Sequence, residues 1–288
     1  MRRPLVLILP LVLALAACGD EASSSTSAAP TSSLAADGSL AKPTVSIPDQ
    51  LPTELVVTDL KVGTGPKAEA DDIVVVNYVG VRSADGTEFD NSYDRGTPFT
   101  VQLGQGNVIA GWDQGLVGVQ TGGRRQLDIP ADLAYGDKPQ GDVIKAGDAL
   151  TFLIDVVAVL PASDAKDEPK IDVQGADNVD TVQVKELVEG TGATPKDGDN
   201  VALQIIIYRA DTGEQLNSSW GLSPVTFVFG PNTDTYPGLA TAVDGMKIGG
   251  RRQAQVPYKD LFNGKGNDTL KLPPGIDVVL VMDLVGIY

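Results

Sequence analysis

Short apolar runs bounded by Gly, Asp and Pro dominate the pattern of residues 49–160. Runs of this length, with alternating or continuous apolar positions, are typical of β-strands. They predict strands at residues 73–79, 99–103, 126–130 and 149–160. One stretch differs, because Trp112, Leu116 and Val119 recur at spacings of four and three, which predicts a short helix. An antiparallel sheet wrapped around one short α-helix, of the α+β class, is the simplest architecture for this pattern.

The pattern occurs a second time further along the chain. GGRRQ at residues 122–126 recurs at 249–253, each copy leading to a proline, and GTG at 63–65 recurs at 190–192. The helical stripe recurs as Leu239, Val243 and Met246. A period of more than one hundred residues indicates a duplicated domain rather than a solenoid. The sequence therefore predicts two tandem domains of one fold.

Polar segments before and between the two copies predict the boundaries of the parts. Residues 19–48 are rich in Ser, Ala, Thr and Pro and contain no aromatic residue, which predicts a disordered tether. Residues 161–176 are polar and have no apolar periodicity, which predicts a linker. The expected parts are a signal segment at 1–17, the tether at 18–48, the first domain at 49–160, the linker at 161–176 and the second domain at 177–288.

The first residues have the pattern of an export signal. Arg2 and Arg3 precede an apolar run at residues 5–15 that is too short to span a membrane stably. Leu15-Ala16-Ala17-Cys18 follows, which resembles the signal of bacterial lipoproteins, in which the cysteine is acylated. Cys18 is the chain's single cysteine, although an ordinary secretory signal with an incidental cysteine is the alternative. We expect an extracytoplasmic protein anchored to the bacterial cell membrane by a lipid on Cys18.

Composition narrows the chemistry. The chain has 42% hydrophobic and 21% charged residues, as globular proteins do. It has no histidine, which excludes Ser-His-Asp and Cys-His catalysis, histidine metal ligands and histidine pH switches. A formal net charge of −16 argues against a nucleic-acid partner, because phosphates require a concentrated basic surface. We expect no cofactor and no metal.

Aromatic residues from many predicted elements of the first copy indicate an apolar pocket. Tyr78 follows an apolar run, Phe89 and Asp90 follow a turn, and Trp112 stands at the entrance of the predicted helix. Several aromatic rings around one carboxylate are typical of a ligand pocket with a few polar groups. An ordinary core with one surface aspartate is the alternative for any of these residues taken singly.

The motifs VVVNYVG, DGTEFDNSYDRGTPF, VIAGWDQGL, GGRRQLDIP, LAYG and LTFLIDV occur in this order. Together they resemble the FK506-binding immunophilins, the FKBP-type peptidyl-prolyl isomerases, over residues 51–160. The resemblance implies a pocket of Tyr78, Phe89, Asp90, Phe99, Val108, Ile109, Trp112, Tyr135, Ile144 and Phe152. It also implies that Trp112 is the floor, that the Ile109 N–H and the Tyr135 hydroxyl hold the peptide's carbonyls, and that Arg95 is the partner of Asp90 and Tyr78.

An apolar pocket suits prolyl isomerisation on physical grounds. The barrier to rotation about an X-Pro bond, about 18–20 kcal/mol, reflects amide resonance. The twisted transition state has less charge separation than the planar amide, so a dry pocket favours it without a nucleophile, a metal or a base. We therefore expect Asp90 to act as an electrostatic and orienting group rather than as a general base.

The expected function is that of a peptidyl-prolyl cis-trans isomerase that assists the folding of exported proteins at the outer face of the membrane. The first domain is expected to be the catalyst. Its expected partners are proline-containing unfolded or exported polypeptides, with macrolide immunosuppressants as further ligands. The alternative is a non-catalytic chaperone or scaffold that binds unfolded chains through the same apolar pockets.

Alignment of glycines and prolines predicts that the second copy has lost the site. It has Ile205 for Tyr78, Leu216 for Phe89, Asn217 for Asp90, Leu222 for Arg95, Val225 for Phe99, Tyr236 for Ile109, Leu239 for Trp112, Asn263 for Tyr135 and Leu280 for Phe152. A fold keeps its core under such changes, whereas a prolyl pocket does not. We therefore expect a degenerate domain with little or no isomerase activity. Trp220, near the lost carboxylate, is either exposed or part of the core.

Overall fold

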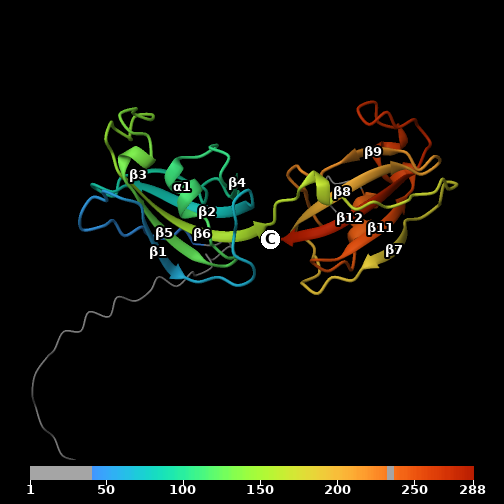
Figure 1. Cartoon of the computed structure of the whole chain (residues 1–288), viewed down its shortest axis with the longest axis horizontal. Helices are drawn as coiled ribbons and strands as arrows, with labels where there is room; N and C mark the ends of the chain where they lie inside the picture. Colours follow the sequence, from blue (N-terminus) through green and yellow to red (C-terminus); the bar gives the residue numbers. More distant parts are fainter. Residues whose placement is uncertain (1–40, 232–236) are drawn as a thin grey trace, which may run out of the picture. The chain divides into compact units, whose positions relative to one another are not determined.

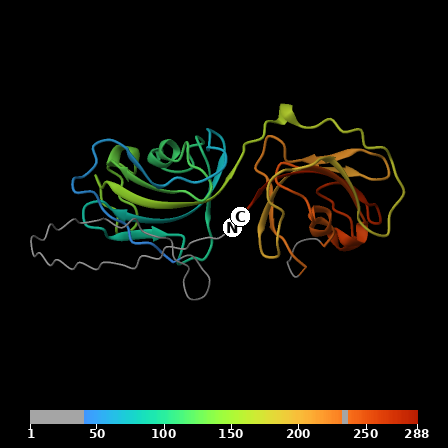
Figure 2. The ribbon, with the colours of Figure 1, turned by 90° about the horizontal axis from the view of Figure 1, so that it is seen from below.

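The computed structural model describes residues 41–231 and 237–288, which form two six-stranded antiparallel sheets (Figures 1 and 2). The first sheet contains β1 (Val56–Lys61), β2 (Ile73–Arg82), β3 (Glu88–Asn91), β4 (Phe99–Gln102), β5 (Arg124–Ile129) and β6 (Leu150–Leu160). Their order is β1-β5-β6-β2-β3, and β4 also pairs with β2. Helix α1 (Ala110–Gly115) packs against this sheet, and the single-turn 3₁₀ helix η1 (Ala131–Leu133) follows β5.

The second sheet repeats this topology. It contains β7 (Gln183–Val188), β8 (Asn200–Arg209), β9 (Gln215–Ser218), β10 (Val225–Val228), β11 (Arg251–Val256) and β12 (Val278–Ile287). Their order is β10-β8-β12-β11-β7, with β9 also paired to β8, and α2 (Pro237–Val243) is its helix. The 3₁₀ helices η3 (Tyr258–Asp260) and η4 (Phe262–Gly264) follow β11, and η2 (Ala165–Asp167) lies between the sheets in sequence. The predicted α+β class with one short helix per domain is confirmed.

The helix of the first domain is shorter than its apolar stripe. Trp112 lies within α1, but the helix ends at Gly115 and Leu116 is its C-terminal cap. Gly118 then adopts a φ of 82°, a left-handed conformation that glycine tolerates well, and the chain turns. Val119 reaches the core from this turn and is 4% exposed. The stripe therefore predicts the buried residues correctly and the length of the helix wrongly.

Matching strand registers establish which residues of the two domains correspond. Phe152 on β6 pairs with Gly80 on β2, and Leu280 on β12 pairs with Ile207 on β8. Asp90 on β3 also pairs with Gly80, as Asn217 on β9 pairs with Ile207. The alignment of Leu280 with Phe152 and of Asn217 with Asp90 thus follows from hydrogen-bonded pairing as well as from the glycines of the sequence.

The repeated GGRRQ motif secures the helix of each domain. Arg125, which is 7% exposed, donates to the Gly115 carbonyl at 2.7 Å and to the Val117 carbonyl at 2.9 Å, at the C-terminal end of α1. Its Nε also bonds Asp59 on β1 at 2.7 Å. In the second domain Arg252 takes this place and donates to carbonyls at the end of α2. The cation satisfies carbonyls that a helix leaves without intrahelical partners and complements its dipole.

The predicted linker lies against the second domain. Ile171 and Val173 pack with Trp220 on the face of β8 and β12 that points away from α2. A backbone hydrogen bond of 2.7 Å from the Ala176 N–H to the Ala210 carbonyl holds the same segment. Trp220 is 7% exposed, so it has the core role. The polar composition of residues 161–176 concealed this contact, because only two apolar side chains make it.

Residues 1–40 and 232–236 lie outside the described residues. The predicted signal segment, Cys18, most of the predicted tether and Tyr236 fall in these ranges. Residues 41–48, the end of the predicted tether, are described, and Lys42 among them forms ion pairs with β3 and the turn that follows it.

Replacing Arg125 by methionine is expected to lower the free energy of unfolding of the first domain by about 2–4 kcal/mol, because two helix carbonyls and Asp59 lose a charged partner. Denaturant unfolding of a Trp220→Phe background, in which Trp112 is the only tryptophan, isolates this domain. Arg209→Met is the control, since Arg209 forms an exposed ion pair with Asp211. An Arg125→Met midpoint equal to that of the control would contradict the role given to this arginine.

Candidate active site

A cavity of about 250 Å³ opens beside α1 in the first domain. Its lining consists of Tyr78, Phe89, Asp90, Phe99, Asn107, Val108, Ile109, Trp112, Tyr135 and Phe152. The structure thus brings together the residues expected from the sequence except Ile144, and adds Asn107. Ile144 is 6% exposed and belongs to the hydrophobic core against which these residues pack.

Trp112 forms the buried centre of the cavity's aromatic wall. Its ring meets those of Tyr78 and Phe152 edge to face, with centroids 5.2 Å apart in both pairs. Phe99 makes a similar contact at 6.0 Å. The edge of one ring carries partial positive charge and the face of the next partial negative charge, so each pair stabilises the arrangement beyond simple burial. Trp112 is only 3% exposed, as expected for a floor.

Gly80 makes room for two of the aromatic rings. A Cβ atom at this position would lie 2.7 Å from Cε1 of Phe152 and 2.8 Å from Cζ of Phe89. Both distances are shorter than real Cβ contacts, so any larger residue would displace a ring. The glycine in VVVNYVG is therefore required by the pocket wall and not by a turn.

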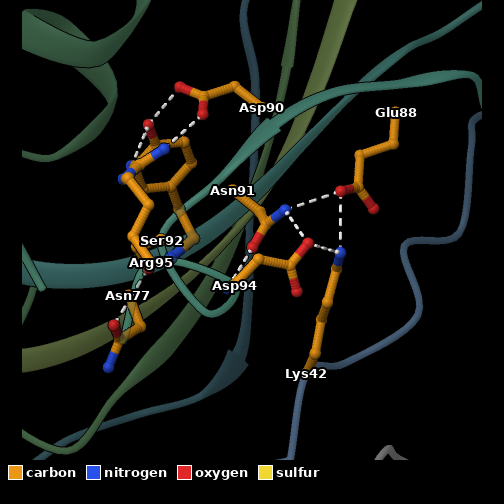
Figure 3. A network of polar contacts seen from close by, with 9 residues as sticks. Lys42, Asn77, Glu88, Asp90, Asn91, Ser92, Asp94 and Arg95 are labelled. Carbon is orange, nitrogen blue, oxygen red and sulfur yellow. Dashed lines mark hydrogen bonds and ion pairs between the residues drawn. The ribbon is translucent and has the colours of Figure 1, made fainter. Parts of the chain in front are cut away.

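Asp90, Arg95 and Tyr78 form a closed polar triad on the cavity rim (Figure 3). Arg95 Nη1 donates to Asp90 Oδ1 at 2.5 Å, and Arg95 Nη2 donates to the Tyr78 hydroxyl at 2.9 Å. The Tyr78 hydroxyl in turn donates to Asp90 Oδ2. Asp90 and Arg95 are each nearly half exposed, whereas Tyr78 is buried. The carboxylate is thus held in place by two donors and keeps an open side.

Burial and the Asp90 carboxylate favour the neutral form of the Tyr78 phenol. Burial, and next the hydrogen bond to the Asp90 carboxylate, raise the pKa of Tyr78 to about 12. The hydrogen bonds of Arg95 to Tyr78 and Asp90 raise the pKa of its guanidinium. The site therefore presents a neutral hydroxyl, a fixed carboxylate and a permanent cation at neutral pH. Such groups orient and stabilise a bound amide without exchanging protons with it.

Asp113 positions the loop that leads into α1, a role that the sequence did not reveal. Its two carboxylate oxygens accept the Gly104 N–H at 3.1 Å and the Gly106 N–H at 3.0 Å. Both glycines have positive φ values, of 76° and 67°, which place their amides within reach of one carboxylate. Ile109 is the N-cap residue of the helix that follows. The sequence signal that could have indicated this role is an acid in the first turn of the helix, shortly after a Gly-X-Gly loop.

Tyr135 lies on the rim, where it is 37% exposed. It follows the short helix η1, and the next residue, Gly136, donates to the Ala131 carbonyl at 2.7 Å. Gly136 has a φ of 57°, so a turn that favours glycine fixes the position of the phenol. Tyr135 thus joins the lining of the cavity from a separate element.

The second domain has a cavity of about 380 Å³ in the corresponding place, with a different lining. Its residues include Ile205, Ile207, Val225, Leu239 and Leu280, with Asn217 at the position of Asp90. The residues aligned with Tyr78, Trp112 and Phe152 are aliphatic there. Among the described residues, this cavity is lined by no charged side chain and no tryptophan or tyrosine.

The family model of FKBP-type peptidyl-prolyl cis-trans isomerases matches residues 65–157 and 192–285. The chain belongs to this family. An FK506-binding protein of Streptomyces anulatus is 50% identical over 123 residues, which covers 42% of this chain and 99% of that protein. A probable FK506-binding protein of Corynebacterium glutamicum is 42% identical over 118 residues, covering 41% and 98%. The crystal structure of AtFKBP13 has 39% identity and a TM-score of 0.35, covering 37% of this chain and 94% of that one.

The activity of this FKBP-type isomerase is expected to stay level between about pH 6 and pH 9, because the chain has no histidine and the Tyr78 phenol remains protonated there. The folded-state pKa of Tyr78, about 12, lies above its usual 10.0. The stabilisation from this tyrosine is therefore complete below pH 10 and is lost as the pH rises toward 12. The level activity profile is tested by measuring kcat/KM against pH in an assay without a coupling protease. A bell-shaped profile centred near neutrality would contradict it.

Proposed function

We propose that the first domain catalyses prolyl isomerisation and that the second domain is a degenerate copy. The observation that carries this proposal is the rim triad of Asp90, Arg95 and Tyr78 above the Trp112 floor. Asn217 and aliphatic residues occupy the corresponding described positions of the second domain. Both domains match the family, so the difference concerns the site and not the fold.

In the proposed mechanism the proline side of the substrate enters the aromatic cavity, where water is excluded. The Ile109 N–H and the Tyr135 hydroxyl hold carbonyls of the peptide, and Asp90 orients the polar edge of the twisting amide. An acceleration of a millionfold requires about 8 kcal/mol of differential stabilisation, shared among desolvation, shape and these hydrogen bonds. Every group in this scheme acts without changing its protonation state.

The proposal extends to the ligands of the pocket and to the location of the protein in the cell. Relatives of the chain bear the name FK506-binding protein, which supports binding of such macrolides in the pocket of the first domain, in competition with peptides. The Leu15-Ala16-Ala17-Cys18 motif supports a lipid anchor at Cys18, with the isomerase at the outer face of the cell membrane. Exported proteins that fold there, where proline isomerisation limits folding, would be the substrates.

The second domain has a candidate role of its own. Its cavity is larger than that of the first domain and has a mostly aliphatic lining, which favours binding of apolar side chains from unfolded polypeptides without catalysis. This corresponds to the chaperone alternative. A chain that suppresses aggregation of a proline-free substrate but does not accelerate proline-limited refolding would favour that alternative over the enzyme.

Asp90→Val and Phe99→Ala, both on the exposed rim, are expected to lower kcat/KM of the whole chain in a prolyl isomerase assay by about tenfold or more, because each removes a contact to the substrate. Asn217→Val and Val225→Ala make matched changes in the second domain and should leave kcat/KM within a factor of about two, since that domain lacks the triad. Activity that survives the first pair and falls with the second would reverse the assignment of the catalytic domain.

Cys18→Ala is expected to move the protein from the membrane fraction to the soluble fraction of its host, because the proposed thioether lipid is the anchor. Among residues 41–231 and 237–288, no helix has the length and apolar character needed to cross a membrane. Ser24→Ala, in the same segment, is the control and should remain with the membrane. A Cys18→Ala protein that stays with the membrane would contradict lipid anchoring at this residue.

A further inference from the structure

Lys42 contacts β3 and the loop after it, the segment that carries Asp90 and Arg95 of the rim triad. In the sequence Lys42 lies more than forty residues before this segment. Its Nζ forms ion pairs with Glu88 Oε1 at 2.7 Å and with Asp94 Oδ2 at 2.9 Å (Figure 3). The first of these acids is on β3, and the second is in the loop that joins β3 to β4. The family match begins at residue 65, so Lys42 belongs to the segment before it.

Asn91 completes a small network around Lys42. Its Nδ2 donates to the same two carboxylate oxygens, at 2.7 Å and 2.8 Å, and its Oδ1 accepts the Asp94 N–H at 2.7 Å. Figure 3 shows Lys42 and Asn91 approaching the pair of acids from different sides. The amide of Asn91 is neutral, so the positive charge that balances Glu88 and Asp94 in this network comes from Lys42.

The charges on β3 and the loop after it affect how Arg95 is held in the triad. Residues 88–96 contain three acids, Glu88, Asp90 and Asp94, and one basic residue, Arg95. Only Asp90 belongs to the pocket. With Lys42 in place, Glu88 and Asp94 have their own cation, and Arg95 bonds Asp90 and Tyr78. Without Lys42, Arg95 would be the only cation of residues 88–96 for all three acids.

The opposite side of the loop is held by buried groups. Ser92 Oγ accepts the Tyr78 N–H at 2.9 Å and donates to Asn77 Oδ1 at 2.9 Å. The Ser92 N–H bonds the Tyr78 carbonyl at 3.0 Å. These bonds fix the base of the loop to β2, whereas the position of Asp94, next to Arg95, depends on Lys42 and Asn91. The Arg95 N–H also bonds the Ser92 carbonyl, at 3.2 Å, so these bonds hold the backbone of the loop, whereas Lys42 acts on the side chain of Asp94.

We propose that Lys42 is a positioning residue for prolyl isomerisation, which keeps Arg95 on Asp90 and Tyr78 by neutralising Glu88 and Asp94. The inference rests on the proposed catalytic role of the first domain. The electrostatics agree with it, since the hydrogen bond to Glu88 raises the pKa of Lys42 and the hydrogen bond from Lys42 lowers the pKa of Asp94.

The test compares Lys42→Met with wild type in the whole chain. Because the ion pairs are partly exposed, kcat/KM should fall by about two- to fivefold. Lys42→Arg should restore it. Lys166→Met is the matched control, because it removes another exposed lysine–aspartate pair, in the linker, and should leave kcat/KM at the wild-type value. In the Trp220→Phe background, the unfolding of Lys42→Met reported by Trp112 should match that of the background alone, which separates positioning from a loss of stability.

A second arm tests whether Lys42 acts through Arg95. In an Arg95→Met background, Lys42→Met should have no further effect on kcat/KM, because the cation that it positions is absent. High salt should lower the kcat/KM of the wild-type chain toward that of Lys42→Met, because it screens the ion pairs of Lys42. Unchanged kcat/KM in Lys42→Met, or an equal loss with and without Arg95, would overturn the proposal. A wild-type chain that fails to accelerate isomerisation would instead refute the proposed function itself.

Discussion

The edge-to-face contacts of Trp112 are the interaction on which the first domain's site depends. Trp112 touches rings that come from β2, β4 and β6, so one side chain sets the distance between the helix and three strands. The cavity exists because these rings meet at their edges and leave space above the indole. Arg125 and Asp113 then hold the two ends of α1 in register with that wall.

The two domains show that the scaffold and the site are separable. The scaffold depends on sheet pairing and on the arginine that caps the helix, and both are present in each domain. The site depends on aromatic rings and on a triad of polar side chains, which only the first domain combines among the described residues. Aliphatic residues fill the same positions in the second domain without disturbing the strand order. Membership of the family therefore fixes the fold of a domain without fixing the residues that line its cavity.

Much of the fold and the pocket could be predicted from the sequence, because both depend on local patterns. Apolar runs located β2, β5 and β6. The order of the motifs predicted a set of pocket residues, and all of them except Ile144 line the cavity. The end of α1 was missed, because a buried turn residue such as Val119 continues the helical spacing without being helical. The packing of Val173 and the ion pairs of Lys42 were also missed. They join segments far apart in the chain through one or two side chains, which leave no periodic signal.

Gly80 has a consequence for the comparison of the two domains. Ile207 occupies its place there, opposite Leu280 as Gly80 is opposite Phe152. Phenylalanines introduced at Leu216 and Leu280 would meet the side chain of Ile207, because in the first domain the rings of Phe89 and Phe152 take up the space beside Gly80. An aromatic wall of this kind therefore requires a glycine at residue 207, a change that by itself enlarges a cavity and lowers stability. Single substitutions at Leu216 or Leu280 are therefore not enough to build an aromatic wall in the second domain.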